Sequence, residues 1–257
     1  MSFTIQNLEF YIMIIVRISA FIYAAPFFSL SNVPRKVKAG LAVFLGLLMV
    51  NLVEYTPLAY SGTIGFATLV IKEGIVGLLI GYAANICTYI VNFSGQLIDT
   101  EIGFSMVNLF DPVSKQQTTI TGNFYSYLIM FLLMATNMHY YILSAICDSF
   151  SIIPLGTAVF HFTFYEIVVQ FLVDYFIIGF RIILPIFATT LLLNIVLGIM
   201  AKVAPQMNML IIGMQLKIMV GLLILVLIVD LVPQVSDFIF AEMKNMMNLV
   251  MKAMTPI

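Results

Sequence analysis

The chain has 257 residues, of which 62% are hydrophobic and only 9% are charged, and its mean hydropathy is +1.11. A soluble domain typically carries about 25% charged residues, so we expect lipid or other subunits, rather than water, to surround much of this chain. The net charge of −1 excludes a nucleic-acid-binding protein, because there is no basic excess to neutralise phosphates.

Apolar segments of two lengths follow one another along the chain. Leu8–Phe28 is long enough to cross a bilayer, and because no basic stretch precedes it we expect a membrane segment of the mature protein rather than a cleaved signal. The later apolar segments are Ala39–Val53, Ile64–Val91, Phe124–Ala135, Ile167–Met200 and Met209–Val232, followed by an amphipathic tail, Ser236–Met254. The first and third of these are shorter than the roughly 20 residues that an upright span needs. The pattern predicts an all-α, polytopic membrane protein.

Ionisable residues interrupt nearly every apolar segment. A charge at the hydrocarbon centre costs at least about 2.5–3.5 kcal/mol, so it should face protein or a water-filled cavity. The predicted buried charges are Arg17, Lys72, Glu73, Asp99, Glu101, Arg181 and Lys217. Lys72 and Glu73 are adjacent and point to different sides of a helix, so each needs its own partner. The sequence does not select those partners, but static ion pairs are favoured over proton transport because buried charges are normally paired.

Glycines predict close helix packing in one apolar segment. Gly77 and Gly81 form a GxxxG pattern, with Gly74 one turn earlier. Glycine at this spacing lets the backbone of another helix approach closely. That helix belongs either to this chain or to another subunit, and both alternatives predict tight packing at this face.

A second set of small residues precedes a loop of mixed polarity. Gly95, Asp99 and Gly103 lie four residues apart on one helical face, and Asp111-Pro112 is predicted to end that helix. The loop consists of Phe104, Ser105, Met106, Val107, Asn108, Leu109, Phe110, Asp111 and Pro112. A loop this apolar should be buried: either it packs back on its own subunit, or it plugs a pore made largely by other chains.

No residue pattern supports catalysis. His139 and His161 stand apart from other metal-ligating residues, and Cys87 and Cys147 are predicted to be buried free thiols in apolar surroundings. The chain contains no HExxH, GxSxG or P-loop motif. We therefore expect a protein that is not an enzyme, with no catalytic residue, no metal and no cofactor.

Five blocks of sequence, in order, resemble the FliR family of flagellar type III export proteins. They are Arg17–Phe28 with Val33-Pro34-Arg35, Glu73–Gly77 leading into Gly95–Ser114, Asn137-Met138-His139 with Asp148–Pro154, Leu184–Gly198, and Ala204–Lys217. The resemblance covers about Arg17 to Leu225, and the Asp111–Ser114 block favours the flagellar branch over the related virulence-secretion subunits. Gln215 departs from the family, which commonly has a helix-breaking proline there.

The resemblance implies a core subunit of the flagellar type III export gate, a multi-pass protein of the bacterial inner membrane in the flagellar basal body. It implies one domain of helical hairpins, 1–257, in which about 1–175 resembles FliP and about 176–257 resembles FliQ. It also implies a helical hetero-oligomeric cone with FliP-like and FliQ-like subunits, an FlhB-like subunit and the basal-body ring. Unfolded flagellar proteins would pass through its channel, and the loop from about Phe104 to Ser114 would help to close it, which favours the plug over the re-entrant loop.

The alternative is a self-sufficient secondary transporter that uses Arg17, Glu73, Asp99 and Arg181 as an ion relay. Such folds often contain internal repeats with matched broken helices, and the sequence contains no convincing repeat. A transporter would work alone or as a homo-oligomer, whereas a gate subunit would be inert without its partners.

Overall fold

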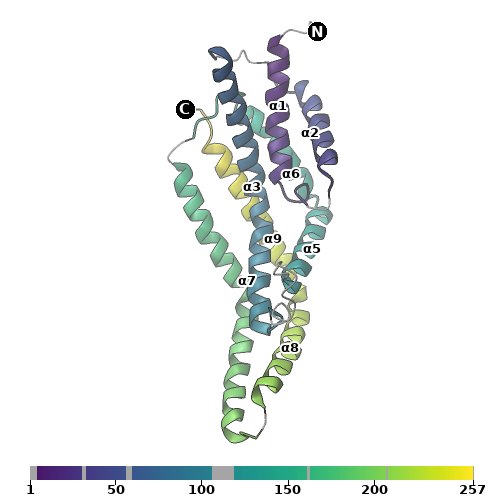
Figure 1. The fold of residues 1–257 in the computed structure, drawn as a ribbon, viewed down its shortest axis with the longest axis vertical. Helices are drawn as coiled ribbons and strands as arrows, with labels where there is room; N and C mark the ends of the chain where they lie inside the picture. Colours follow the sequence, from purple (N-terminus) through teal and green to yellow (C-terminus); the bar gives the residue numbers. More distant parts are fainter. Residues whose placement is uncertain are drawn as a thin grey trace. The chain divides into compact units, whose positions relative to one another are not determined.

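The computed structural model describes residues 5–30, 33–55, 60–105, 119–160, 163–206 and 208–256. The helices are α1 (Ile5–Ala24), α2 (Arg35–Val50), α3 (Gly62–Ile102), α5 (Ile120–Ala135), α6 (Met138–Ile152), α7 (Thr163–Val203), α8 (Met209–Ile228), the short 3-10 helix η1 (Val229–Leu231) and α9 (Val232–Lys252), all drawn in Figure 1. Within the described ranges there is no strand. The prediction of an all-α chain is confirmed.

Several helices are long and apolar enough to cross a membrane. By length and composition they are Asn7–Ala24, Gly62–Ile102, Phe164–Val203 and Ile211–Lys252, and the bent pair α5 and α6, whose axes differ by 74°, would make a fifth span if counted together. The prediction of a polytopic membrane protein is therefore also confirmed.

The chain forms two compact units that do not follow its linear order. The first unit contains residues 1–87, 133–171 and 240–257, and the second contains 88–132 and 172–239. Helices α3, α5, α7 and α9 each contribute to both. The division near residue 175, into a part that resembles FliP and a part that resembles FliQ, concerns likeness to other families. It stays a prediction.

In the first unit, α1 carries several fully buried side chains. Its Met13, Ile14, Ile18 and Phe21 are 0–1% exposed. Helix α2 lies beside α1 (Figure 1). Burial on more than one side explains why α1 is apolar around most of its circumference.

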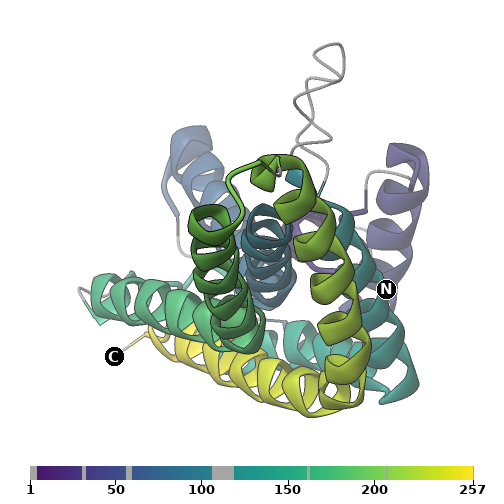
Figure 2. The same ribbon diagram turned by 90° about the horizontal axis from the view of Figure 1, so that it is seen from below.

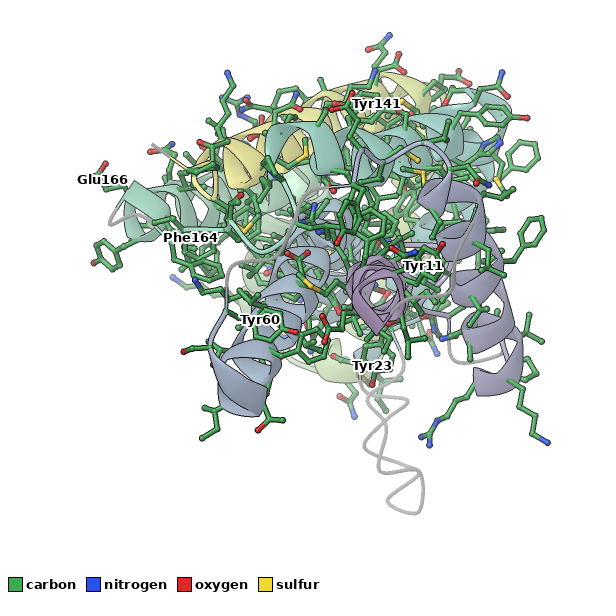
Figure 3. All side chains as sticks on the ribbon, turned by 90° about the horizontal axis from the view of Figure 1, so that it is seen from above. Tyr11, Tyr23, Tyr60, Tyr141, Phe164 and Glu166 are labelled. Carbon is green, nitrogen blue, oxygen red and sulfur yellow. The ribbon has the colours of Figure 1, made fainter. Side chains whose placement is uncertain are left out.

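Two aromatic hydroxyls tie the outer parts of the first unit together. Tyr60, just before α3, donates a hydrogen bond to the Glu9 carboxylate of α1 at 2.6 Å, which raises the pKa of Tyr60 because deprotonation would break the bond. Tyr141 of α6 lies beside α9 (Figure 3) and accepts a hydrogen bond from Asn248. The Lys244 ammonium lies 4.9 Å from the centre of the Tyr141 ring.

In the second unit, the last part of α7 and α8 form a hairpin (Figure 2). Gly213 of α8 faces Leu197 of α7 so closely that a Cβ atom would lie 3.1 Å from that side chain. Gln215 lies inside α8, which continues without a break. The missing family proline at this position therefore agrees with the local structure.

The largest differences from the sequence prediction concern α3 and α6. Helix α3 runs continuously to Ile102, so the polar stretch after Val91 continues the apolar helix instead of beginning a new element. It ends at Gly103, whose φ of +97° is strained for any residue with a side chain. The prediction that Asp111-Pro112 ends this helix was therefore wrong, and those two residues lie outside the described ranges. Helix α6 had not been predicted.

Candidate functional site

A buried ion pair joins α1 to α3. Arg17 and Glu73 are both 0% exposed, and Arg17 Nε lies 2.5 Å from Glu73 Oε2. Transferring either charge alone from water to this environment would cost several kcal/mol, so burial of each charge depends on the presence of the other. The pair is the one salt bridge with both partners among the described residues.

The end of α6 and the turn after it add further hydrogen bonds to this pair. Arg17 Nη1 donates hydrogen bonds to the carbonyl oxygens of Ser149 at 3.1 Å and Ile153 at 2.9 Å. The second carboxylate oxygen of Glu73 accepts the Gly156 N–H at 2.8 Å. The Arg17 guanidinium also lies 4.5 Å from the centre of the Phe150 ring, a distance that permits a cation–π interaction. Two charged side chains thus connect three parts of the first unit.

The GxxxG face of α3 packs on α1 next to this cluster. A Cβ atom on Gly77 would overlap the Arg17 carbonyl oxygen, and one on Gly81 would lie 2.7 Å from the Phe21 carbonyl oxygen. At Gly74 an added Cβ would make only an ordinary contact, 3.6 Å from Val16. The helix that approaches this face therefore belongs to the same chain.

In the second unit, Asp99 holds the beginning of α5 against the last turns of α3. Its carboxylate is 4% exposed and accepts the Thr121 N–H, at 3.1 Å and 3.3 Å to the two oxygens. A carboxylate at a helix N-terminus satisfies a free N–H and interacts favourably with the helix dipole. Gly95 lies against Gly122 so closely that a Cβ atom on Gly95 would overlap its backbone.

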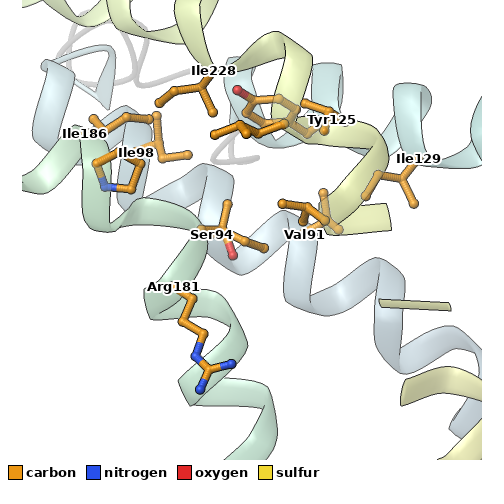
Figure 4. Close-up of a pocket in the computed structure, with 13 residues that line it drawn as sticks. Val91, Ser94, Ile98, Tyr125, Ile129, Arg181, Ile186 and Ile228 are labelled. Carbon is orange, nitrogen blue, oxygen red and sulfur yellow. The ribbon is translucent and has the colours of Figure 1, made fainter. Parts of the chain in front are cut away.

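The other predicted charges occupy less buried positions. Glu101 is half-buried and accepts a hydrogen bond from the Thr190 hydroxyl at 3.2 Å. Lys72 and Lys217 are half-buried. Arg181 was predicted to be buried and is exposed, because its long side chain carries the guanidinium past the edge of an apolar cavity and away from it (Figure 4).

Only the beginning of the predicted plug loop is described. Phe104 and Ser105 are half-buried, and the rest of that prediction, Met106–Pro112, lies outside the described residues. Gly103, predicted as a packing glycine, has no atom within 4 Å of an added Cβ. Its role is conformational, since it ends α3 with a positive φ.

The remaining candidate metal ligands, the cysteines and histidines, do not form a cluster among the described residues. Cys147 was predicted to be buried and is exposed, because it lies on the outer side of α6, whereas Ile146 and Ser149 face inward. His139 is half-buried, and the side chains of Cys87 and His161 lie outside the described set. Among the described residues no three His, Cys, Asp or Glu side chains are grouped to hold a metal ion.

Sequence reasoning missed the residues that complete these clusters. Ser149, Ile153, Gly156 and Thr121 contribute backbone carbonyl or N–H groups, which every residue of this kind carries. Their side chains therefore gave no signal. The aromatic partner, Phe150, could have been suspected only from its aromatic character, because many aromatic residues in this chain serve as ordinary apolar packing.

Together these features define a multi-pass, all-α membrane protein whose most buried charges are neutralised or capped within the chain. The chain belongs to the family described as bacterial export proteins, family 1, whose model matches residues 8–243. Proteins named flagellar biosynthetic protein FliR are among its relatives. The one from Bacillus subtilis (strain 168) is 29% identical, over 93% of this chain and 95% of that protein.

Two further relatives with the same name come from other bacteria. The protein of Aquifex aeolicus (strain VF5) is 26% identical over 84% of this chain and 83% of its own length. That of Escherichia coli (strain K12) is 23% identical over 93% of this chain and 92% of its own length. The resemblance to the FliR family drawn from the five sequence blocks is thereby confirmed.

Proposed function

We propose that the chain is a core subunit of the flagellar type III protein export gate, in which it helps to form and close the channel that carries flagellar proteins across the bacterial inner membrane. The observation that carries the proposal is the family match over residues 8–243, together with relatives named for flagellar biosynthesis along nearly their whole length. The subunit acts without catalysis: its buried charges position helices.

The proposal includes assembly with FliP-like and FliQ-like subunits, an FlhB-like subunit and the basal-body ring. Helix length supports a protein environment beyond the bilayer. Helices α3 and α7 have 41 residues each, which corresponds to about 60 Å at 1.5 Å per residue. The hydrocarbon core is only about 30 Å thick, so an apolar helix of this length needs other subunits to cover the remainder.

The geometry of the charges argues against the ion-relay transporter. Arg17 and Glu73 bind each other and fixed backbone groups. Asp99 is held by a different partner, the N–H of Thr121. Arg181 is exposed. Groups held separately in this way suit a rigid scaffold better than a chain of proton transfers.

The proposal assigns the plug to the loop that begins at Phe104. Two described features support it: Gly103 turns the chain sharply at the end of α3, and the Asp99 carboxylate holds the beginning of α5 close to that end. Both ends of the loop are therefore fixed close to each other, which would hold a plug at a constant position in the channel.

The assembly is tested by native mass spectrometry of the tagged full chain, extracted from its own cells in mild detergent. We expect one copy of the chain in a large complex with FliP-like and FliQ-like subunits. A chain that leaves the membrane alone, or as a homodimer that retains a small solute, would refute the gate and favour a transporter.

Deleting Phe104–Phe110 tests the plug separately. We expect the complex to assemble, because the Asp99 and Arg17 contacts are untouched, and the membrane to become permeable to ions. The measurement is ion conductance of the complex in a planar bilayer, with Cys147→Ser as a control outside the loop. Wild-type conductance in an assembled deletion complex would contradict the plug while leaving the export role in place.

A further inference from the structure

The first unit carries a groove between the ends of α2 and α6. Its volume is about 560 Å³, and its lining comes from the last turn of α2 with the residues that follow it, and from the last turns of α6 with the turn after them. The buried part of the lining is apolar: Met49, Phe150 and Leu155 are 4–8% exposed. Ligand pockets measure about 300–1,000 Å³, so the groove has room for more than one side chain.

Two carboxylates line the groove, and no basic side chain lines it. Glu54 follows α2 and Asp148 lies in α6, and both are exposed. Among the described residues neither carboxylate has a hydrogen-bond or ion-pair partner. The groove therefore combines an apolar floor with two uncompensated negative charges.

The exposed face of α2 extends the apolar surface of the groove. Phe44, Leu47 and Leu48 are 50–59% exposed, and Leu52, which lines the groove, is 74% exposed. Residues three and four apart share a helix face, so the first three form one stripe that ends about one turn before Leu52. An apolar stripe that leads into a groove is the kind of surface that an amphipathic helix covers.

The groove is built against the buried ion pair of Arg17 and Glu73. The Phe150 ring of its floor lies 4.5 Å from the Arg17 guanidinium. Arg17 Nη1 also binds the carbonyl oxygen of Ile153, the residue before Pro154, which lines the groove. The end of α6 is thereby held in place before any partner binds, and a preformed site costs less conformational entropy on binding.

The charge of the groove discriminates among possible occupants. An anionic lipid headgroup or a nucleic acid would meet two like charges. A metal ion would need a denser set of ligands, and among the described residues no three His, Cys, Asp or Glu side chains are grouped to hold one. A protein segment that carries a basic side chain beside apolar ones complements both parts of the lining.

We propose that this groove is a docking site for an amphipathic helix of another protein, which presents Lys or Arg beside bulky apolar side chains. The apolar side chains cover Leu52 and the stripe on α2 and enter the groove over Phe150. The basic group pairs with Glu54 and Asp148. Because a gate subunit works in an assembly, the docking site rests on the proposed function, and it adds the place and the chemistry by which one partner attaches.

Photo-crosslinking in native membranes identifies the occupant. A photo-reactive residue replaces Leu52 in the tagged full chain, cells are illuminated before extraction, and the captured peptide is sequenced by mass spectrometry. We expect one partner segment in which Lys or Arg lies within one helical turn of bulky apolar residues. Capture of phospholipid, of a segment without a basic residue, or of nothing would overturn the proposal.

Charge reversal tests the pairing. Glu54→Lys with Asp148→Lys, added to the photo-reactive chain, should lower capture about tenfold because attraction becomes repulsion. The matched control is Glu166→Lys with Glu242→Lys, the same change of charge in the first unit but outside the groove, and it should leave capture unchanged. Replacing the basic residue of the captured partner by Glu should restore capture by the reversed groove. Thermal unfolding in detergent verifies that each variant is folded.

Unchanged capture by the folded groove variant would overturn the proposal, as would a partner substitution that restores nothing. Equal losses in the two double variants would overturn it in favour of diffuse charge attraction. The crosslink is made before extraction, so its outcome does not depend on isolating the gate complex. A chain that captures its partner but leaves the membrane without FliP-like and FliQ-like subunits would refute only the proposed function. An intact gate complex with an empty groove would refute only the docking site.

Discussion

Glu73→Ala is expected to lower the stability of the chain by about 3–5 kcal/mol, the cost of leaving one partner of a buried ion pair without the other. The change removes the carboxylate from Arg17, which is 0% exposed, and also removes the acceptor of the Gly156 N–H. The measurement is the midpoint of thermal unfolding of a fluorescently tagged chain in mild detergent, followed by size-exclusion chromatography, together with its amount in the membrane.

The matched control is Lys72→Ala, because Lys72 precedes Glu73 on the same helix and is half-buried. We expect it to change stability by much less. The double variant Arg17→Met with Glu73→Leu should recover only part of the loss. Apolar residues of similar volume often replace a buried ion pair without cost, but the Gly156 N–H and the carbonyl oxygens of Ser149 and Ile153 would lose the partners they have in the native chain. If Glu73→Ala were as mild as Lys72→Ala, the ion pair would not be the element that holds α1 and α3 together.

Gly77→Ala is expected to destabilise the same contact by about 1–3 kcal/mol, the usual cost of an overpacked interior. The added methyl group would overlap the carbonyl oxygen of Arg17. The obstacle is backbone and cannot rotate away, so α1 and α3 would have to separate. The separation would also lengthen the Arg17–Glu73 hydrogen bond, now 2.5 Å. The same unfolding measurement applies.

Gly74→Ala serves as its control, one turn earlier on α3. The new methyl group would lie 3.6 Å from Val16, an ordinary contact, and alanine favours the helix over glycine by about 1 kcal/mol. We expect unchanged or slightly higher stability. Equal destabilisation by both substitutions would show that loss of glycine as such, and not the contact with Arg17, is what matters.

The positions of the most important charges could be suspected from the sequence. Arg17 and Glu73 stood out because ionisable groups inside apolar segments must be paired. Their partnership could not be read, since several opposite charges were available. Arg181 shows the limit of the same argument: the sequence indicated a charge in an apolar segment, and the side chain reaches past the cavity edge instead of into the interior.

The packing role predicted from glycine spacing also holds at some positions and fails at another. Gly77 and Gly81 have the spacing that predicts close packing, and α1 is the helix that approaches them. Gly103 has the same spacing relative to Asp99 and Gly95, yet it lies outside the helix with φ +97°. A spacing rule assumes that the helix continues, and only the structure shows where α3 ends.

The sequence by itself determined the all-α membrane class, the approximate apolar segments and the family. These depend on local composition, on the cost of charge in hydrocarbon and on ordered blocks of residues. Only the tertiary structure decided which groups meet: Glu73 with Arg17 and Gly156, and Asp99 with the beginning of α5. Most of those partners are backbone carbonyl and N–H groups. Because every residue except proline carries both, they leave no mark in the sequence, and folding alone brings them to the buried charges.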